Sequence, residues 1–154
     1  MPNPELTADC TRCVGLCCVL LPFRANAGFG ADKPGGVPCE NLDPRDRCRI
    51  HADLLDEGWS GCVAFDCFGA GQQVTQVTYA GRSWRAHDNL AEMGAVFTVM
   101  RELHELLLRL KGTDDQGLSA EIVSLRAASA EELLTLDLDE LSNRVAATDG
   151  AGGR

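Results

Sequence analysis

Four of the chain's eight cysteines fall within nine consecutive residues, the segment 10–18 with the sequence CTRCVGLCC. Two thiols separated by two residues, like those of Cys10 and Cys13, lie on one tight turn and can bind the same metal ion or cluster. The doublet Cys17-Cys18 is expected to behave differently, because adjacent side chains point apart. Either these two thiols serve different metal centres, or one of them is buried and binds no metal.

The other four cysteines follow by residue 67, and residues 68–154 contain none. Cysteines that acted only as small buried apolar residues would have no reason to cluster in this way. Thiolates are soft ligands, which favours zinc, copper(I) or iron–sulfur over magnesium or calcium. Eight thiols suit two four-thiolate zinc sites, or one cubane iron–sulfur cluster with thiols left over, and their number does not choose between these. The predicted metal ligands are Cys10, Cys13, Cys17, Cys18, Cys39, Cys48, Cys62 and Cys67.

In a secreted protein the same cysteines would indicate a disulfide framework. The N-terminal sequence MPNPE has neither the basic nor the apolar region of a secretory signal, and the chain has no run of ~18 apolar residues that could span a membrane. We therefore expect a cytoplasmic protein with reduced thiols and no native disulfides. The net charge of −9 argues against sequence-independent binding of nucleic acid. With no apolar run long enough to span a bilayer, neither nucleic acid nor a membrane is expected as a partner.

Residues 1–72 are interrupted repeatedly by glycine and proline, and no amphipathic period persists in them. Residues 13–23 are apolar enough for a short buried helix, and residues 51–57 for a helical turn or two that ends at Gly58. So little periodic apolar surface cannot build a sufficient core alone, and we expect metal binding to stabilise this half of the chain. Residues 73–85 carry β-branched and aromatic residues around a glycine turn, which predicts a β-hairpin.

Residues 88–111 are predicted to form a long helix, because apolar residues recur there at spacings of three and four. Asp88 is the expected N-cap, and Glu92 adds a favourable charge in the first turn. The helix is expected to be covered on more than one side, because valines and a further leucine widen its apolar stripe.

Two shorter helices are predicted after a polar linker. The first of these covers residues 119–128, with Ser119 as its N-cap. Ser129 and Glu132 form a capping box that begins the other, which is interrupted around residues 137–139.

The predicted fold class is therefore mainly α, with a loop-rich, metal-nucleated cysteine cluster and a small β-hairpin followed by a helical hairpin or bundle. The expected division places the metal-binding region at residues 1–87, the helical region at 88–148 and a disordered tail at 149–154.

The segment 8–18, ADCTRCVGLCC, resembles the signature of the YkgJ-type cysteine-cluster proteins, a family regarded as zinc- or iron-chelating. The family's motif is C-x2-C-x2-C-C, and this chain has one more residue in the second gap. Residues 38–42 (PCENL) and 47–51 (RCRIH) resemble the family's proline–cysteine and C-x-I-Y elements, and Cys62 or Cys67 resembles its last cysteine. The resemblance implies metal chelation by these cysteines.

Two further segments, 17–23 and 61–74, are similar to the leader module that precedes pentapeptide repeats in actinobacterial proteins. The helical region also looks like the rest of that leader, so the resemblance covers most of the chain and is strongest over residues 8–85. A related cysteine cluster occurs in flagellin lysine methylases, which makes an iron–sulfur cluster a serious alternative to zinc.

Four other side chains were candidates for a place in the site. His51 could be a nitrogen ligand, although with eight thiols present a supporting or surface position is favoured. His87 is expected in a loop or capping position, and His104 is expected as a partly buried residue of the long helix. Asp66, beside Cys67, could accept a hydrogen bond from a metal-bound group or cap a turn.

The leading hypothesis is a non-enzymatic protein in which the thiolates hold zinc or an iron–sulfur cluster, with the metal in a largely structural role. No set of serine, histidine and carboxylate at a recognisable spacing suggests hydrolysis. The rival functions are an iron–sulfur redox protein or enzyme component, and a copper(I) or other metal chaperone. Besides the metal ion, another protein bound through the helical region is a candidate partner.

Overall fold

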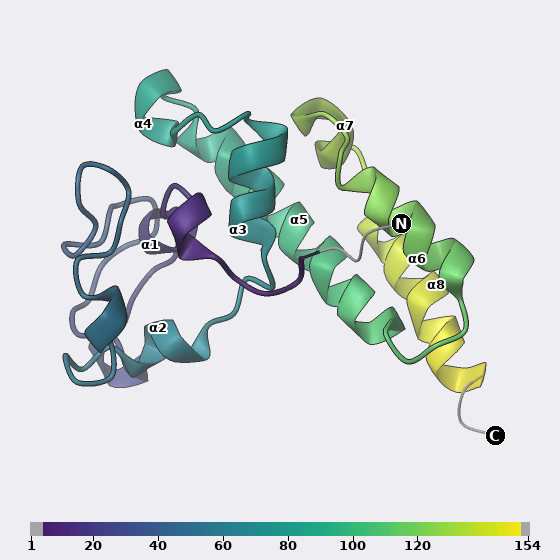
Figure 1. The fold of residues 1–154 in the computed structure, drawn as a ribbon, viewed down its shortest axis with the longest axis horizontal. Helices are drawn as coiled ribbons and strands as arrows, with labels where there is room; N and C mark the ends of the chain where they lie inside the picture. The colour runs from purple at the N-terminus through teal and green to yellow at the C-terminus, as the bar shows by residue number, and fades with distance from the viewer. Residues whose placement is uncertain (1–4, 152–154) are drawn as a thin grey trace.

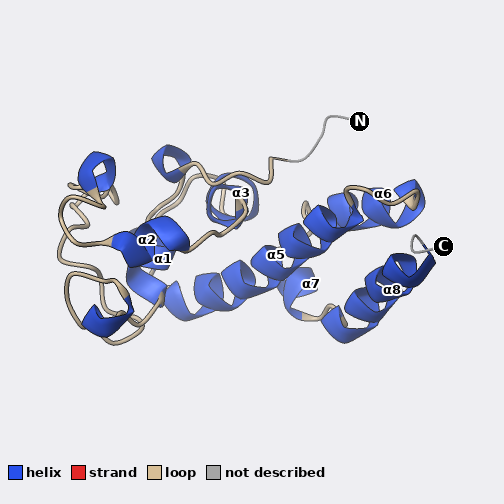
Figure 2. Ribbon diagram, turned by 90° about the horizontal axis from the view of Figure 1, so that it is seen from below, coloured by secondary structure: helices blue, strands red, loops and turns tan. Residues whose placement is uncertain are grey.

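The computed structural model describes residues 5–151, and helices and loops make up almost all of it (Figures 1 and 2). Within these residues, β structure is limited to two isolated antiparallel bridges, Phe23–Lys33 and Leu42–Cys48. The prediction of a mainly α fold is confirmed. The helices are α1 (Leu16–Leu20), α2 (Ser60–Ala64), α3 (Ala70–Gln73), α4 (Trp84–His87), α5 (Leu90–Leu110), α6 (Gln116–Leu125), α7 (Ala130–Leu134) and α8 (Leu138–Ala151). Short turns of other helix types are η1 (Cys10–Arg12), η2 (Ala25–Ala27), η3 (His51–Asp53) and the π-helical η4 (Val74–Thr78).

Helix α5 runs through the middle of the molecule, with the loop-rich residues on one side of it and α6–α8 on the other (Figure 1). It contacts α1, α3, α4, α6, α7 and α8. Its buried residues lie on more than one side of the helix, as the widened apolar stripe predicts. Of the helices that the structure describes, none combines the length and the apolarity needed to cross a bilayer. The buried residues of α5 are Met93, Val96, Phe97, Met100, Leu103, His104, Leu106, Leu107 and Leu110.

The molecule has two apolar cores. The larger, which we call the first core, is built around α5 and extends from Leu6 to Val145. It crosses residue 87, where the boundary between two regions was expected, so the N-terminal segment and the C-terminal helices share it. The second core is small and lies among the loops of residues 18–62. Its buried members are Phe23, Cys39, Leu42 and Trp59.

Several predicted helix boundaries agree with the structure. The helix expected over residues 88–111 is α5, and α1 lies within the segment 13–23. The capping box is present at α7, where Ser129 Oγ accepts from the Glu132 amide at 3.2 Å and a Glu132 carboxylate oxygen accepts from the Ser129 amide at 2.9 Å. The predicted interruption after this helix separates α7 from α8.

Two predicted N-caps are wrong. Asp88 has a left-handed backbone conformation (φ 47°) at the end of α4, and Asn89 occupies the N-cap of α5. Ser119 lies inside α6 rather than at its start, because Asp115 caps this helix by accepting a hydrogen bond from the Leu118 amide at 2.9 Å.

The tail expected to be disordered from residue 149 is helical as far as Ala151, because α8 continues into it. Asp149 accepts a hydrogen bond from Arg109 of α5 at 2.7 Å, and this ion pair joins the end of α8 to α5. The rest of the expected tail, residues 152–154, lies outside the described part of the chain.

The β-hairpin predicted at residues 73–85 is wrong, since the segment is helical through η4 and turns at Ala80-Gly81 before α4. Val74 and Thr75 are buried, and η4 packs on α5. Thr75 Oγ1 also accepts a hydrogen bond from the Val14 amide at 3.3 Å, which joins η4 to the N-terminal segment. Burial and this tertiary hydrogen bond outweigh the β-propensity of valine and threonine.

Two threonines of η4 allow a matched test of this interpretation. Thr75→Val removes the hydroxyl that pairs with the buried Val14 amide and should lower the free energy of unfolding by about 1–3 kcal/mol. Thr78 Oγ1 is buried without a hydrogen-bond partner among the described residues, so Thr78→Val should be neutral or stabilising. Urea unfolding followed by circular dichroism measures both values. Equal destabilisation by the two variants would contradict the assigned role of Thr75.

Candidate metal centre

Seven of the eight cysteines line one cavity of about 90 Å³ in the loop-rich part of the molecule. They come from segments far apart in the sequence: η1 and the residue that follows it, α1, the loops around residues 39 and 48, and α2. The wall between them is apolar and largely aromatic, with Phe23, Phe29, Trp59 and Phe65 among its residues. The fold thus gathers thiols that the sequence spreads over more than fifty positions. The cysteines of this cavity are Cys10, Cys13, Cys17, Cys18, Cys39, Cys48 and Cys62.

The eighth cysteine, Cys67, lies next to the same group. A Cβ atom placed on Gly71 of α3 would lie 2.8 Å from Cys13 Sγ and 3.8 Å from Cys67 Sγ. Both sulfurs therefore lie against this glycine, which leaves space for them because it has no side chain. Each of the eight predicted ligands is thus close to at least one other.

Burial raises the pKa of most of these thiols, and each thiolate raises the pKa of its neighbours further. Loss of hydration raises the pKa of Cys10 to about 11, and the nearby thiols of Cys13 and Cys67 add to the shift. Loss of hydration likewise raises the pKa of Cys62 to about 12, with contributions from Cys18, Cys39 and other thiols.

The thiols of the doublet Cys17-Cys18 influence each other. Interaction with Cys18, followed by burial, raises the pKa of Cys17 well above its usual value, and interaction with Cys17 lowers the pKa of Cys18. The positive charge of Lys33 also lowers the pKa of Cys18. The two residues pack differently, since Cys17 packs against the first core and Cys18 against the second.

Lys33 supplies a positive charge beside the thiols near the second core. Its ammonium group donates to the carbonyl oxygens of Leu21 and, at 3.3 Å, of Val19, at the end of α1. It also lies over the ring of Phe23, 4.5 Å from the centroid. Burial lowers the pKa of Lys33, while the thiolates of Cys39 and Cys18 raise it. These contacts fix the ammonium group where it can offset the charge of ionised sulfurs.

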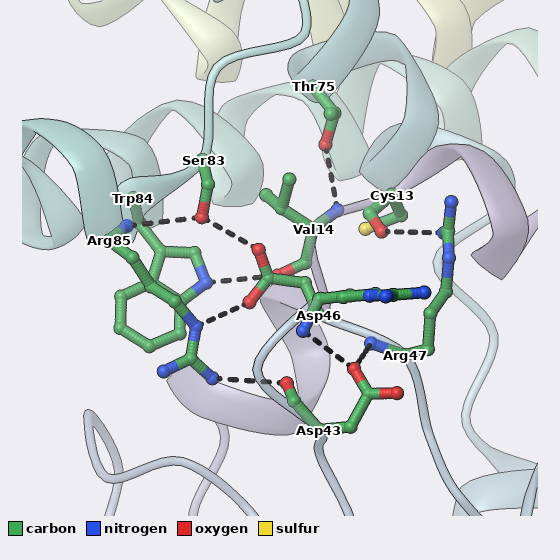
Figure 3. A network of polar contacts seen from close by, with 10 residues as sticks. Cys13, Val14, Asp43, Asp46, Arg47, Thr75, Ser83, Trp84 and Arg85 are labelled. Atoms are coloured by element: carbon green, nitrogen blue, oxygen red, sulfur yellow. Dashed lines mark hydrogen bonds and ion pairs between the residues drawn. The ribbon is translucent and has the colours of Figure 1, made fainter.

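Arg47 holds the backbone of the C-x2-C turn. Its guanidinium donates to the carbonyl oxygen of Cys10 at 2.9 Å. It donates less closely to the carbonyl oxygen of Cys13, at 3.4 Å (Figure 3). The Asp43 carboxylate accepts from the Arg47 amide at 3.0 Å and so closes the turn that carries Arg47. The loop of residues 39–50 is in this way tied to the turn that carries two of the thiols.

A buried carboxylate, Asp46, attaches the same loop to α4. Asp46 accepts hydrogen bonds from Ser83 Oγ and from Arg85 Nε, both at 2.7 Å (Figure 3). The indole of Trp84 donates to the Val14 carbonyl oxygen at 2.9 Å, which adds the N-terminal segment to the network. The sequence does not single out Asp46, Arg47 or Lys33, because the partners of their side chains named above lie 12 to 39 residues away and follow no motif.

The other candidate side chains have different positions. His51 is exposed and lines the cavity with the thiols, a position that fits the favoured supporting or surface role and does not decide whether it is a ligand. Asp66 caps a turn, as one of its two predicted roles requires, because its carboxylate accepts from the Phe68 amide at 2.8 Å. His87 ends α4 as a junction residue, and its side chain lies outside the described part of the structure.

As they stand, no three His, Cys, Asp or Glu side chains of the described residues converge closely enough to hold a metal ion. The thiols face a shared cavity and lie near one another in smaller groups. Binding of a metal would require them to draw closer, which short side chains on loops can do by rotating about the Cα–Cβ bond.

His104 joins the Cys67 loop to the C-terminal helices. It is fully buried on α5, with Nδ1 2.6 Å from the Phe68 carbonyl oxygen and Nε2 accepting from Arg126 Nε at 2.9 Å. Arg126, which follows α6, also donates to Gln73 of α3 at 2.8 Å. The predicted position of His104 on the long helix is confirmed, but the side chain is fully buried rather than partly buried. Its contacts fix the position of the residue next to Cys67.

We expect burial of His104 to make part of the free energy of unfolding sensitive to acid. Burial, with a smaller effect of Arg126, lowers the pKa of His104 to about 4, whereas an unfolded histidine titrates near 6.5. As the pH falls from about 6.5 to about 4, the unfolded chain takes up the proton first, so the folded state loses about 2–3 kcal/mol. In His104→Gln, whose amide can still donate to Phe68 and accept from Arg126, this component should be absent. Urea unfolding at about pH 7 and about pH 4.5 would measure it, and equal pH dependence in both proteins would contradict the assignment.

The comparisons with known proteins leave the function open. The chain is 44% identical to a Bacillus subtilis (strain 168) protein described as uncharacterized protein YybG, over 148 residues that cover 88% of this chain and 53% of the relative. The chain therefore spans about half the length of the relative it matches. No family model matches it, and no solved structure is significantly similar.

Proposed function

We propose that this chain is a thiolate metal-binding protein in which zinc or an iron–sulfur cluster joins the loops of residues 10–67. The observation that carries the proposal is the shared cavity: seven cysteines from separate segments line it, and Cys67 lies beside Cys13 next to it. An ordinary apolar core has no need of eight thiols in one place.

The chemistry of the site fits a soft metal. The donors are thiols, and the wall around them includes four aromatic side chains and is mainly apolar, which suits a soft metal held by thiolates. Four thiolates on a divalent ion leave a net negative charge, which the ammonium group of Lys33 and the guanidinium group of Arg47 are placed to offset. The donors, the mainly apolar wall and the counter-charge together support thiolate coordination.

A structural role for the metal follows from the small size of the second core. Only four buried residues form it, and one of these is Cys39. Fully burying an apolar side chain contributes about 1.5–3 kcal/mol, whereas a structural zinc contributes on the order of 10 kcal/mol. The resemblance of residues 8–18 to the YkgJ-type signature supports the same function, and we propose that the chain is a member of that family.

The purified protein should contain metal bound through its thiols. Elemental analysis identifies the metal, and an anaerobic visible spectrum separates a brown iron–sulfur protein from a colourless zinc protein. Alkylation of the native protein should be slow until a chelator is added. Metal-free protein with four disulfides, and alkylation that the chelator does not change, would contradict the proposal.

Removal of the metal should affect the two parts of the chain differently. After a chelator has removed the metal, amides of residues 18–62 should lose protection from hydrogen exchange, because the second core alone is too small to hold these loops. Amides of α5 should stay protected by the first core. Hydrogen exchange with mass spectrometry, with the metal restored in a control, makes the comparison. Unchanged protection of the loops without metal would show that the metal isn't needed for folding.

A further inference from the structure

We infer that the eight thiols form two sets of four, each of which binds its own metal centre. The inference rests on the proposed function. The first set contains Cys10, Cys13, Cys17 and Cys67. The second set contains Cys18, Cys39, Cys48 and Cys62.

Packing against the two cores separates the sets. Three cysteines, Cys13, Cys17 and Cys67, pack against the first core. The second core includes Cys39 and is packed by Cys18 and Cys62. The division passes between Cys17 and Cys18, so one short helix, α1, presents adjacent thiols to different parts of the molecule.

Contacts within each set agree with this division. In the first set, the sulfurs of Cys13 and Cys67 both lie against Gly71. In the second set, the Cys39 amide donates to the Cys18 carbonyl oxygen at 2.9 Å, and Cys48 pairs with Leu42 of the same loop in a β-bridge.

Backbone contacts assign the two members that pack on neither core. The Cys13 amide donates to the Cys10 carbonyl oxygen at 3.4 Å, and Arg47 donates to the carbonyl oxygens of both residues, which places Cys10 in the first set. Cys48 pairs in its β-bridge with Leu42, a buried member of the second core, which places Cys48 in the second set. The two sets adjoin at α1, where Cys17 and Cys18 are neighbours in the chain.

Each set also has a cation of its own. Arg47 donates to the backbone of Cys10 and Cys13 in the first set. Lys33 lines a small pocket together with Cys39 of the second set, and it donates to the carbonyl oxygens of Val19 and Leu21, which closely follow Cys18. Four thiolates are the ligand set both of a structural zinc and of a four-iron cluster, so the division holds for either group.

Native mass spectrometry of the folded full-length chain tests the division by counting zinc ions or clusters per molecule. The wild-type chain should carry about two centres, and Cys67→Ser or Cys62→Ser should carry about one. Adding Cys13→Ser to Cys67→Ser should remove no further centre, because both thiols belong to the same centre. Adding Cys62→Ser to Cys67→Ser should remove both centres.

A glycine substitution tests the first set without removing a thiol. In Gly71→Ala the new methyl group would lie 2.8 Å from Cys13 Sγ, so this variant should lose one centre. Gly112→Ala is the matched control, since a Cβ there has no atom within 4 Å, and it should keep both. Helical circular dichroism checks that each variant retains α5.

The outcomes distinguish the two proposals. A wild-type chain that binds no metal would overturn the proposed function. A wild-type chain that binds metal but loses all of it in every single cysteine variant would overturn only the division. Loss of both centres in the Cys13→Ser, Cys67→Ser double variant would also overturn the division into two sets.

Discussion

Burial of α5 on more than one side positions both halves of the chain. Nine of its residues are buried, and at about 1.5–3 kcal/mol for each apolar side chain the helix supplies a large part of the apolar stabilisation. The N-terminal segment and α3 pack on one part of this surface, and α6–α8 pack on another. Because α5 is fixed from both sides, it can carry the buried hydrogen bonds of His104 to Phe68 and Arg126. These hydrogen bonds position the Cys67 loop, and therefore also one side of the cluster of eight cysteines.

The loops of residues 18–62 are organised in a different way. Their core has four buried members, with other apolar residues only partly buried against it. Polar contacts also set the course of the loops: Lys33 on the end of α1, Arg47 on the C-x2-C turn and Asp46 on α4. Such contacts direct the backbone, yet each contributes only about 0.5–3 kcal/mol net. The loops therefore have a defined course with little stability of their own, which is the condition in which a bound metal would have its largest effect.

The long helix, the capping box of Ser129 and the cysteine cluster could be predicted because each has a local pattern. The segment 73–85 could not, since its β-branched residues favour a strand while burial against α5 makes it helical. The caps differ for local reasons. Asp88 and Ser119 are acceptable cap residues by type, but Asp115 caps α6 three residues before Leu118, and the left-handed Asp88 ends α4 so that Asn89 occupies the N-cap of α5. Within the site, the cysteines were visible in the sequence, whereas Asp46 and Gly71 were not, because their roles depend on neighbours distant along the chain.

The high pKa values of Cys10 and Cys62, about 11 and about 12, affect how a metal would enter. Such thiols hold their protons at neutral pH, and each must release its proton before it can coordinate. A centre of four thiols would release up to about four protons on loading, so its apparent affinity would fall by up to about ten-thousandfold for each unit of acidification. The protein would then exchange protons for metal, and its occupancy would report the acidity of its surroundings as well as the supply of the ion.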